Sequence, residues 1–211
     1  MDKKPVLLAQ LAREPVPGLV KTRLQPHLSA LQAAQLHELM VEHVCTMLCG
    51  SAAGTVQLWV DGDPEAALFR RCRTFGISDV LIQQGGDLGQ RMAHICKQGL
   101  GEHDAVILVG SDAPSIDSDY LSSALDSLSE ADVVLGPALD GGYVLLGLRR
   151  FAAELFEGIH WGEHTVLAET LAVLDRLGWS YRLQEPVPDI DRPEDLQFLP
   201  DAIRAALPGT T

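Results

Sequence analysis

The chain has 211 residues, of which 46% are hydrophobic, and this is enough for one sizeable core. Its 16 Lys and Arg residues stand against 29 Asp and Glu residues, which gives a formal charge of −13. Surplus negative charge opposes binding to nucleic-acid backbones and anionic membranes, so we expect a small-molecule partner and a single domain over residues 1–211.

The sequence also lacks the features expected of secreted and membrane proteins. Its four cysteines show no C-x-x-C pair and no zinc-type spacing with histidine, which is typical of reduced thiols. The apolar run at residues 6–8 is too short for a signal peptide, and no segment approaches the roughly 20 apolar residues that cross a membrane. We therefore expect a cytoplasmic protein; the pattern does not define its oligomeric state.

Strand and helix patterns alternate along the first part of the chain. Short apolar runs predict strands at residues 5–12, 55–60, 80–84 and 105–110. Helical spacing predicts helices at 29–49, with Ser29 as the cap, at 64–75, and from the segment GGDLGQRM to about Gly101. A long loop over residues 13–26 joins the first strand to the first helix.

The second part continues the alternation with one interruption. After a helix over about 117–128, two apolar runs within 132–149 are joined by glycines, which predicts a bent or hairpin pair of strands. A helix from Glu163 to Gly178 and a strand over 179–187 follow. This order predicts an α/β fold, a three-layer sandwich with a mostly parallel central sheet, and no linker divides it.

The abrupt end of the fourth predicted strand points to Asp112. The stretch VILVGSDAPSID passes from an unbroken apolar run directly into Gly110, Ser111 and Asp112. In mostly parallel sheets, ligands collect beyond the carboxyl ends of the strands. We therefore expect Asp112 at the mouth of a site.

The loop after the first strand carries cations within an acidic chain. Such loops receive phosphates because backbone N–H groups and helix starts attract anions, and Lys21 and Arg23 add full positive charge. The loop is not a Walker A motif, because Val20 precedes Lys21 where glycine is needed, and no G-x-G-x-x-G follows the strand. Spacing alone leaves a phosphate grip and an exposed charge pair equally open.

The segment PDIDRPEDL carries further acidic residues. Asp189 and Asp191 are two apart in an extended stretch, so their carboxylates should point the same way. Asp191 also fits a helix cap, with Pro193 in the first turn and Glu194 completing a capping box. If Asp112 and Asp191 end strands at one sheet edge, they can together hold Mg²⁺ or Mn²⁺ on the phosphates of a nucleotide.

Two glycine-rich stretches have both a structural and a functional interpretation. In GGDLGQRM, Gly86, Asp87 and Gly89 either receive a base or ribose or form the start of an Asp-capped helix. In LDGGYVLLG, Asp140 lies in a hairpin turn or in a binding loop. Trp161, just before a helix, is a lid residue or part of a hydrophobic staple.

Six segments in this order carry a resemblance to a known family: PVPGLVKTRL, GDLGQRM, GSDAPSI, GPALDGGYVLLGL, HWGEHTVL and DIDRPEDL. They resemble the bacterial glycosyltransferase-A-like family of nucleotide-diphospho-sugar transferases, which includes proteins labelled arsenosugar-biosynthesis glycosyltransferases. More distantly, the lysine loop, the lone strand-end Asp and the tail resemble phospholactate guanylyltransferases and sugar-acid cytidylyltransferases. The resemblance covers nearly the whole chain and implies the nucleotide-diphospho-sugar transferase fold.

The resemblance implies roles for two of these regions. Asp112 becomes the metal-binding carboxylate and Asp191 its second ligand, with Mg²⁺ or Mn²⁺ as the cofactor. The loop residues Pro17, Gly18, Lys21 and Arg23 become the holders of the nucleotide phosphates.

With the donor phosphates assigned to that loop, the acceptor must approach from another side. The glycines at Gly141 and Gly142 allow close backbone approach, so we expect the acceptor beside them, at Asp140 and Tyr143. Asp140 would take or bind a hydroxyl proton, and Trp161 would close over the acceptor.

The predicted reaction has more than one form. Many glycosyltransferases of this fold carry Asp-x-Asp at the central strand, whereas Ser111-Asp112-Ala113 offers one aspartate, which is closer to the nucleotidyltransferase pattern. Our first hypothesis is a metal-dependent transferase that acts on a nucleotide-sugar donor and a small-molecule acceptor. The alternatives are a nucleotidyltransferase that joins a nucleoside monophosphate to a phosphorylated acceptor, and a nucleotide-binding protein without turnover.

Overall fold

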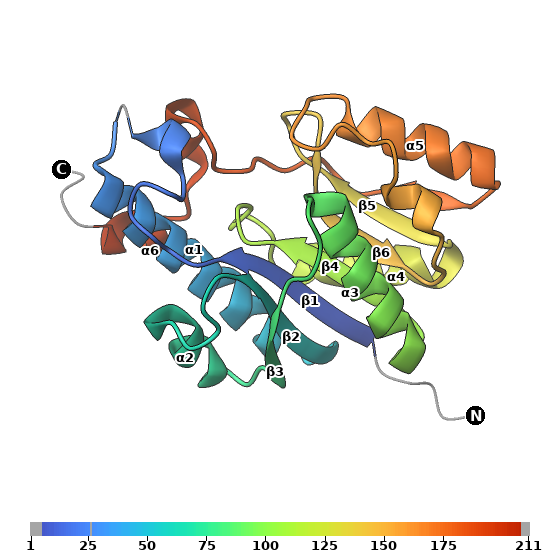
Figure 1. Ribbon diagram of the computed structural model, residues 1–211, viewed down its shortest axis with the longest axis horizontal. Coiled ribbons are helices and arrows are strands. Elements are labelled where there is room, and N and C mark those ends of the chain that lie inside the picture. Colours follow the sequence, from blue (N-terminus) through green and yellow to red (C-terminus); the bar gives the residue numbers. More distant parts are fainter. Residues whose placement is uncertain (1–5, 26, 208–211) are drawn as a thin grey trace.

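A seven-stranded sheet with the strand order β3-β2-β1-β4-β6-β5-β7 forms the centre of the molecule (Figure 1). The computed structural model describes residues 6–25 and 27–207. The strands are β1 (Val6–Arg13), β2 (Gly54–Asp61), β3 (Asp79–Ile82), β4 (Val106–Gly110), β5 (Val133–Pro137), β6 (Tyr143–Leu148) and β7 (Tyr181–Leu183). Only β6 runs antiparallel to its neighbours, β4 and β5. The predicted mostly parallel sheet is therefore confirmed, and β4 is its central strand.

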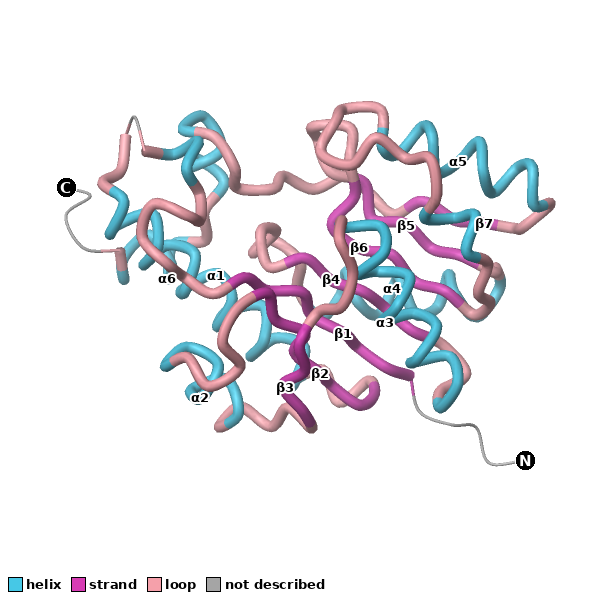
Figure 2. Tube along the Cα trace, in the orientation of Figure 1, coloured by secondary structure: helices cyan, strands magenta, loops and turns pink. Residues whose placement is uncertain are grey.

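Helices cover both faces of the sheet (Figure 2). They are α1 (Ala30–Gly50), α2 (Ala67–Arg73), α3 (Leu88–Glu102), α4 (Ser118–Glu130), α5 (Val166–Leu177) and α6 (Asp201–Ala206), with 3₁₀ turns η1 (Thr22–Leu24), η2 (Ala153–Phe156) and η3 (Pro193–Phe198). The α3 and α5 helices pack on one face, whereas α1 and α4 pack on the other. This is the predicted three-layer arrangement. No helix among the described residues is long and apolar enough to span a bilayer.

The residues of β1 show why the strand lies in the middle of these layers. Leu7 and Ala9 face the α3 and α5 side, whereas Leu8 packs with Val44 and Leu48 of α1. Both faces of the strand are thus buried, which is why its sequence is nearly continuously apolar. Burial of each leucine contributes roughly 1.5 to 3 kcal/mol, so the sheet centre is a rigid base for its loops.

Local capping signals are confirmed by the structure, while two element boundaries are corrected. Ser29 Oγ accepts from the backbone N–H of Gln32 (3.3 Å) at the start of α1. The helix predicted from Glu163 begins only at Val166, after a turn. The strand predicted over 179–187 is limited to Tyr181–Leu183, with one isolated bridge at Val187, because the prolines on either side of Val187 cannot donate to a strand ladder.

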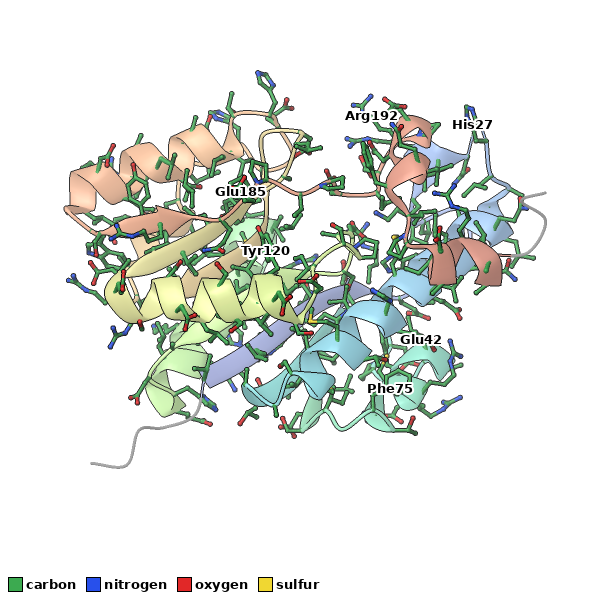
Figure 3. All side chains as sticks on the ribbon, turned by 180° about the vertical axis from the view of Figure 1, so that it is seen from behind. His27, Glu42, Phe75, Tyr120, Glu185 and Arg192 are labelled. Atoms are coloured by element: carbon green, nitrogen blue, oxygen red, sulfur yellow. The ribbon has the colours of Figure 1, made fainter. Side chains whose placement is uncertain are left out.

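The chain after β7 returns across the molecule to the start of α1. On the rear face, Tyr120 of α4 lies beside this segment, and its hydroxyl donates to the carbonyl of Glu185 (3.0 Å; Figure 3). Farther along, Ile190 is fully buried in a small cluster with residues of η1, α1 and α6. The Ile190 N–H also donates to the carbonyl of Asp112 (2.8 Å). The acidic segment PDIDRPEDL (residues 188–196), called the tail below, is therefore held against both the end of β4 and the loop after β1.

Candidate active site

A cavity of about 560 Å³ lies at the carboxyl ends of the parallel strands. It brings together residues from the loop after β1, the ends of β2, β3 and β4, the β5–β6 loop and the C-terminal tail. Its charged and polar lining includes Arg13, Lys21, Arg23, His37, Asp61, Gln83, Arg91, Asp112, Asp140, Tyr143, Asp189 and Asp191. Segments that the sequence analysis singled out separately thus meet in one cavity.

Lys21 and Asp112 form an ion pair on the floor of this cavity. Lys21 Nζ lies 2.9 Å from Asp112 Oδ1 and also donates to the carbonyl of Ile190. The lysine side chain is only 4% exposed, whereas half of the Asp112 side-chain surface remains open. Lys21 is therefore not the exposed surface charge that spacing alone allowed.

The backbone of Lys21 is held in an unusual conformation. Its φ of 49° and ψ of 38° lie in the left-handed region, which non-glycine residues rarely adopt. Gly18, three residues earlier, has a φ of 85°, so the loop turns sharply before the lysine. Such strain costs about 1 to 3 kcal/mol and persists where the surrounding structure enforces it, commonly at functional sites. In this backbone conformation the Lys21 side chain points to the floor of the cavity, where its ammonium group meets Asp112.

Opposing effects act on the Asp112 carboxyl. Burial of the group favours the neutral acid, but the charge of the nearby Lys21 ammonium favours the carboxylate, and the net result is a lowered pKa. Asp112 is consequently an anion at neutral pH. It can accept hydrogen bonds or bind a cation through the part of its surface that stays open.

Two buried polar residues, His37 and Gln10, lie behind Asp112. His37 Nε2 lies 2.9 Å from the carbonyl oxygen of Arg13, so Nε2 carries the proton and Nδ1 offers a lone pair. Burial lowers the pKa of His37, and its Nδ1, 3.8 Å from Asp112 Oδ1, has no hydrogen-bond partner in the described chain. Gln10 Nε2 donates to the Ser111 hydroxyl (2.9 Å), which fixes the residue before Asp112.

The structure places Asp191 in the cavity and corrects its predicted capping role. Asp191 Oδ2 pairs with Arg23 Nη1 at 2.5 Å. The cap before η3 comes from Asp195, whose Oδ2 accepts from the backbone N–H groups of Asp191 (3.0 Å) and Arg192 (2.6 Å). Because η3 begins at Pro193, Asp191 lies one residue too early to act as its cap. Its carboxylate is therefore not used as a cap and can contact a ligand in the cavity.

Asp189, one of the two tail aspartates noted in the sequence, also lines the cavity. Burial and the negative charge of Asp140 raise its pKa to about 6. Neither Asp140 nor Asp189 forms a salt bridge with any described residue, whereas Lys21, Arg23 and Arg91 each pair with a carboxylate. One side of the cavity therefore carries uncompensated negative charge.

The predicted acceptor loop has a defined turn. Asp140 Oδ1 accepts from the Gly142 N–H (2.9 Å), and Gly141 has a φ of 95°. A Cβ on Gly141 would lie 2.1 Å from the carbonyl oxygen of His164, so this position requires glycine. Tyr143 follows at the start of β6, where burial raises its pKa. The predicted residues Asp140 and Tyr143 do line the cavity.

The segment that opens α3 has the Asp-capped helix start that was one of the two interpretations of its sequence. Asp87 Oδ1 accepts from the Gln90 N–H (2.8 Å) as the cap of α3. Gly89 is covered by Trp161, since a Cβ there would lie 2.3 Å from the indole Nε1. Trp161 in turn packs edge-on to Tyr143, with ring centroids 6.3 Å apart. The indole thus links the α3 start to the acceptor loop.

Several cavity residues were missed by the sequence analysis. Gln83, Leu88 and Arg91 line the wall next to the α3 start, where we had singled out Gly86, Asp87 and Gly89. Asp61 Oδ2 binds Arg91 Nη1 (2.6 Å) and Arg13 Nε (3.2 Å). The rule that strand ends form sites could have identified Arg13 and Asp61, because they end β1 and β2 and are paired in register. The same rule applies to Gln83, which directly follows β3, whereas His37 and Arg91 lie within helices and carried no comparable signal.

The residues present fit a divalent cation that arrives with a ligand. Asp112 and Asp191 offer carboxylate oxygens, which are the ligands that Mg²⁺ and Mn²⁺ prefer. The described residues contain no preformed group of three metal-binding side chains. Mg²⁺ commonly binds through one or two carboxylates together with waters and substrate phosphates, so a complete protein cage is not needed.

Comparison with solved structures defines the class of fold. A protein from Desulfovibrio desulfuricans G20, described as a candidate nucleotide-diphospho-sugar transferase, matches with a TM-score of 0.84 and 30% identity, over 94% of this chain and 87% of its own. A Mycobacterium tuberculosis H37Rv protein solved with manganese matches with a TM-score of 0.56 and 13% identity, over 93% of this chain and 97% of its own. The fold is that of the nucleotide-diphospho-sugar transferases, as predicted.

Sequence comparison then places the chain in a family. Residues 46–163 match the family described as "uncharacterized protein conserved in bacteria (DUF2064)". This match covers more than half of the chain, and the chain belongs to that family.

A curated relative links the chain to a known activity. The 2-phospho-L-lactate guanylyltransferase of Methanothermobacter thermautotrophicus is 32% identical over 148 residues, which are 66% of this chain and 64% of that protein. The chain thus spans slightly less than two thirds of its relative. The predicted resemblance is confirmed by these relatives, and each of the two is described as a transferase.

Proposed function

We propose that this chain is a metal-dependent nucleotidyltransferase, which transfers a nucleoside monophosphate from a nucleoside triphosphate to a small-molecule acceptor. The observation that carries the proposal is the ion pair between the buried Lys21 and the single strand-end carboxylate of Asp112, 2.9 Å apart. The guanylyltransferase relative supports the same reaction. Ser111 and Ala113, on either side of Asp112, leave no second carboxylate at this strand end.

Lys21 and Asp112 would perform complementary tasks in this reaction. The ammonium group of Lys21 would neutralise charge on the phosphate oxygens as pyrophosphate leaves. Asp112, together with Asp191, would hold a divalent cation, which supplies further charge neutralisation at the phosphates when bound. Because Lys21 is held on two sides by protein groups, its position needs little adjustment when the nucleotide arrives.

The charge of the cavity explains why a cation should accompany the nucleotide. Four cationic side chains line it (Arg13, Lys21, Arg23 and Arg91) against five aspartates (Asp61, Asp112, Asp140, Asp189 and Asp191). A triphosphate would add several negative charges to a cavity that is already slightly negative when all five are ionised. We therefore expect nucleotide binding to require Mg²⁺ or Mn²⁺.

Transfer of a sugar from a nucleotide-sugar is the second candidate function. The Desulfovibrio structure, with its nucleotide-diphospho-sugar transferase description, supports it. The phosphates of a nucleotide-sugar would meet the same lysine and the same carboxylates. The two candidates differ in their products, because nucleotidyl transfer releases pyrophosphate whereas glycosyl transfer releases a nucleoside diphosphate.

The experiment combines binding with product analysis. Thermal shift with nucleoside triphosphates and nucleotide-sugars, with and without Mn²⁺, identifies a donor because a ligand of the folded state raises its stability. That donor is then incubated with a panel of small hydroxyl, carboxylate and phosphate acceptors, and pyrophosphate and nucleoside diphosphate are measured. Metal-independent binding that persists in Asp112→Asn, without any product, would contradict the proposal and favour a nucleotide-binding protein.

A further inference from the structure

Ile190 lies in the tail between two aspartates that line the cavity. Asp189 and Asp191 contribute to the lining, whereas Ile190 is fully buried. Its side chain packs in an apolar cluster with residues of η1, α1 and α6, and no buried member of this cluster lines the cavity. Any role of Ile190 in the site must therefore come from the groups that its backbone holds.

The apolar cluster joins parts of the chain that are distant in sequence. Leu24 belongs to the loop that carries Lys21, Met40 belongs to α1 and Ile203 belongs to α6, and each is at most 3% exposed. Ile190 fixes the tail to these three elements. Because protein interiors are close-packed, a smaller side chain at this position leaves a gap that lets the tail backbone shift.

The backbone of Ile190 contacts both members of the ion pair on the cavity floor. Its N–H donates to the carbonyl of Asp112 (2.8 Å), and its own carbonyl oxygen accepts from Lys21 Nζ. Lys21 Nζ in turn lies 2.9 Å from Asp112 Oδ1. The three residues thus form a closed set of contacts, in which one residue of the tail is bonded to both charged residues.

Lys21 needs such a contact because its side chain is long and flexible. An ammonium group is a compact charge on a four-carbon stem, so attraction to a carboxylate alone leaves several positions open to it. The hydrogen bond to the Ile190 carbonyl adds a second fixed point. Position matters in such a site, because a displacement of about 1 Å can cost roughly 100-fold in rate.

We propose that Ile190 is a positioning residue for the phosphate-binding group of Lys21. Packing of the Ile190 side chain in the apolar cluster fixes the backbone carbonyl that holds the ammonium group, and Ile190 itself does not touch the nucleotide. This inference rests on the proposed function, because it acts through the lysine that the proposed reaction uses.

Acylation of Lys21 measures its position without any substrate. At constant pH, an N-hydroxysuccinimide ester should modify Lys21 slowly in the wild type, because the side chain is 4% exposed, and the exposed Lys97 is the internal reference. The rate at Lys21 relative to Lys97 should rise by about 10-fold in Ile190→Ala and by about 3-fold in Ile190→Val. Mass spectrometry of the peptides measures both sites.

The matched controls are the same substitutions at Ile203. This residue is 3% exposed in the same cluster, but its backbone bonds to Pro200 and Leu207, not to the ion pair. Urea unfolding should show similar losses of stability at positions 190 and 203, whereas Lys21 acylation in the Ile203 variants should stay within about 2-fold of wild type. Equal acylation in the matched variants would overturn the inference. If Ile190→Ala does not fold, the two valine variants give the same comparison.

Binding of inorganic pyrophosphate shows whether the position of Lys21 matters for phosphates. In calorimetric titration at a constant Mg²⁺ concentration, Ile190→Ala should weaken pyrophosphate binding by about 10-fold, because the ammonium group is displaced. Ile190→Val should restore most of the affinity, and Ile203→Ala should stay within about 2-fold of wild type. Equal weakening by Ile190→Ala and Ile203→Ala, or faster acylation with unchanged pyrophosphate affinity, would overturn the inference.

The results separate this inference from the proposed function. Transfer product from the wild type, with no difference between the Ile190 and Ile203 variants, would overturn the inference and leave the proposed function intact. Effects specific to Ile190 on acylation and pyrophosphate binding, without transfer product from any nucleotide, would support the inference and contradict the proposed function. Failure of the wild type to bind pyrophosphate and nucleotides would overturn both.

Discussion

The two sides of the cavity differ in how their charges are arranged. On one side, called the paired side below, the loop after β1 and the ends of β2 and β4 meet Arg91 of α3 and Asp191 of the tail, and the ion pairs are Lys21–Asp112, Arg23–Asp191 and Arg91–Asp61. The other side, called the unpaired side below, carries Asp140 of the β5–β6 loop and Asp189 of the tail, and neither forms a salt bridge with a described residue. Burial and the negative charge of Asp140 raise the pKa of Asp189.

This difference separates the tasks of the two sides. A phosphate that shares the positive charge of Lys21 leaves Asp112 less neutralised and so better able to hold a cation, and phosphate and metal binding should favour each other on the paired side. The unpaired side has carboxylates that can accept a proton from an acceptor group. We therefore expect the donor on the paired side and the acceptor on the unpaired side.

The most demanding test of the metal and phosphate roles proposed for the paired side is the substitution Asp112→Asn. We expect metal-dependent nucleotide binding to weaken by at least about 2 kcal/mol, because a charged partner of both the metal and Lys21 is lost. The free energy of unfolding should also fall by about 1 to 3 kcal/mol, since the Lys21 ammonium, 4% exposed, loses its counter-charge. Titration with Mn²⁺ and nucleotide, together with urea unfolding, measures both quantities.

The control for Asp112→Asn is the same substitution at an exposed site. Asp126 lies on the outer face of α4 and outside the cavity, so Asp126→Asn should leave both measurements unchanged. Wild-type Mn²⁺ dependence in Asp112→Asn would remove Asp112 from the metal site.

The next largest effect should come from Asp140→Asn on the unpaired side. Turnover with the true acceptor should fall by about 100-fold if Asp140 takes the hydroxyl proton, while donor affinity stays within about 2-fold of wild type. The asparagine Oδ1 can still accept from the Gly142 N–H, so the turn and the melting temperature should be preserved. Weaker donor binding together with a lowered melting temperature would show that Asp140 only shapes the turn.

Lys21→Ala examines the phosphate role of the paired side. Loss of a charge-assisted contact should weaken nucleoside di- and triphosphates by about 1 to 3 kcal/mol but leave the corresponding nucleoside nearly unaffected. Lys97 is exposed on α3, and Lys97→Ala controls for the loss of one positive charge from the whole molecule. If nucleoside and nucleotide weakened equally, Lys21 would not be a phosphate-binding residue.

These comparisons also show which features the sequence could predict. The caps Ser29 and Asp87 depend on residues three positions away, and the structure has both at helix starts. The position of Asp112 followed from an apolar run and the rule for strand ends. Such local and topological signals were sufficient for the sheet, its helices and one central site residue.

The remaining site depends on contacts between distant parts of the chain. Gln83 is oriented by carbonyls 71 and 24 residues earlier in the chain, and no spacing rule relates these positions. His37 is part of an ordinary helical pattern and meets the site only because α1 packs against β1, where its ring binds the carbonyl of Arg13. Even locally, the predicted cap at Asp191 was wrong, because η3 begins at Pro193 and the side chain of Asp195 accepts from the N–H groups of Asp191 and Arg192.

The smallest predicted effect concerns Asp189 and the free energy of unfolding. Burial, followed by the charge of Asp140, raises its pKa to about 6, so the folded protein binds this proton more tightly than the unfolded chain does. The group therefore lowers stability as the pH rises from about 4 to 6, and the loss is complete above that range. Asp189→Asn should stabilise the ligand-free protein at neutral pH by about 1 kcal/mol, after allowance for solvent screening.

Urea unfolding of the wild type and Asp189→Asn over this pH range measures the effect. The gain should be largest at neutral pH and should vanish only near pH 3, about one unit below the unfolded pKa, where both states of the wild type carry a protonated Asp189, so the titration extends to that pH. Asp126→Asn again serves as the control, since an exposed aspartate outside the cavity should show no such dependence. A gain that is equal at all pH values would mean that repulsion from Asp140 is not its cause, and the unpaired side would not carry the excess negative charge on which the acceptor assignment depends.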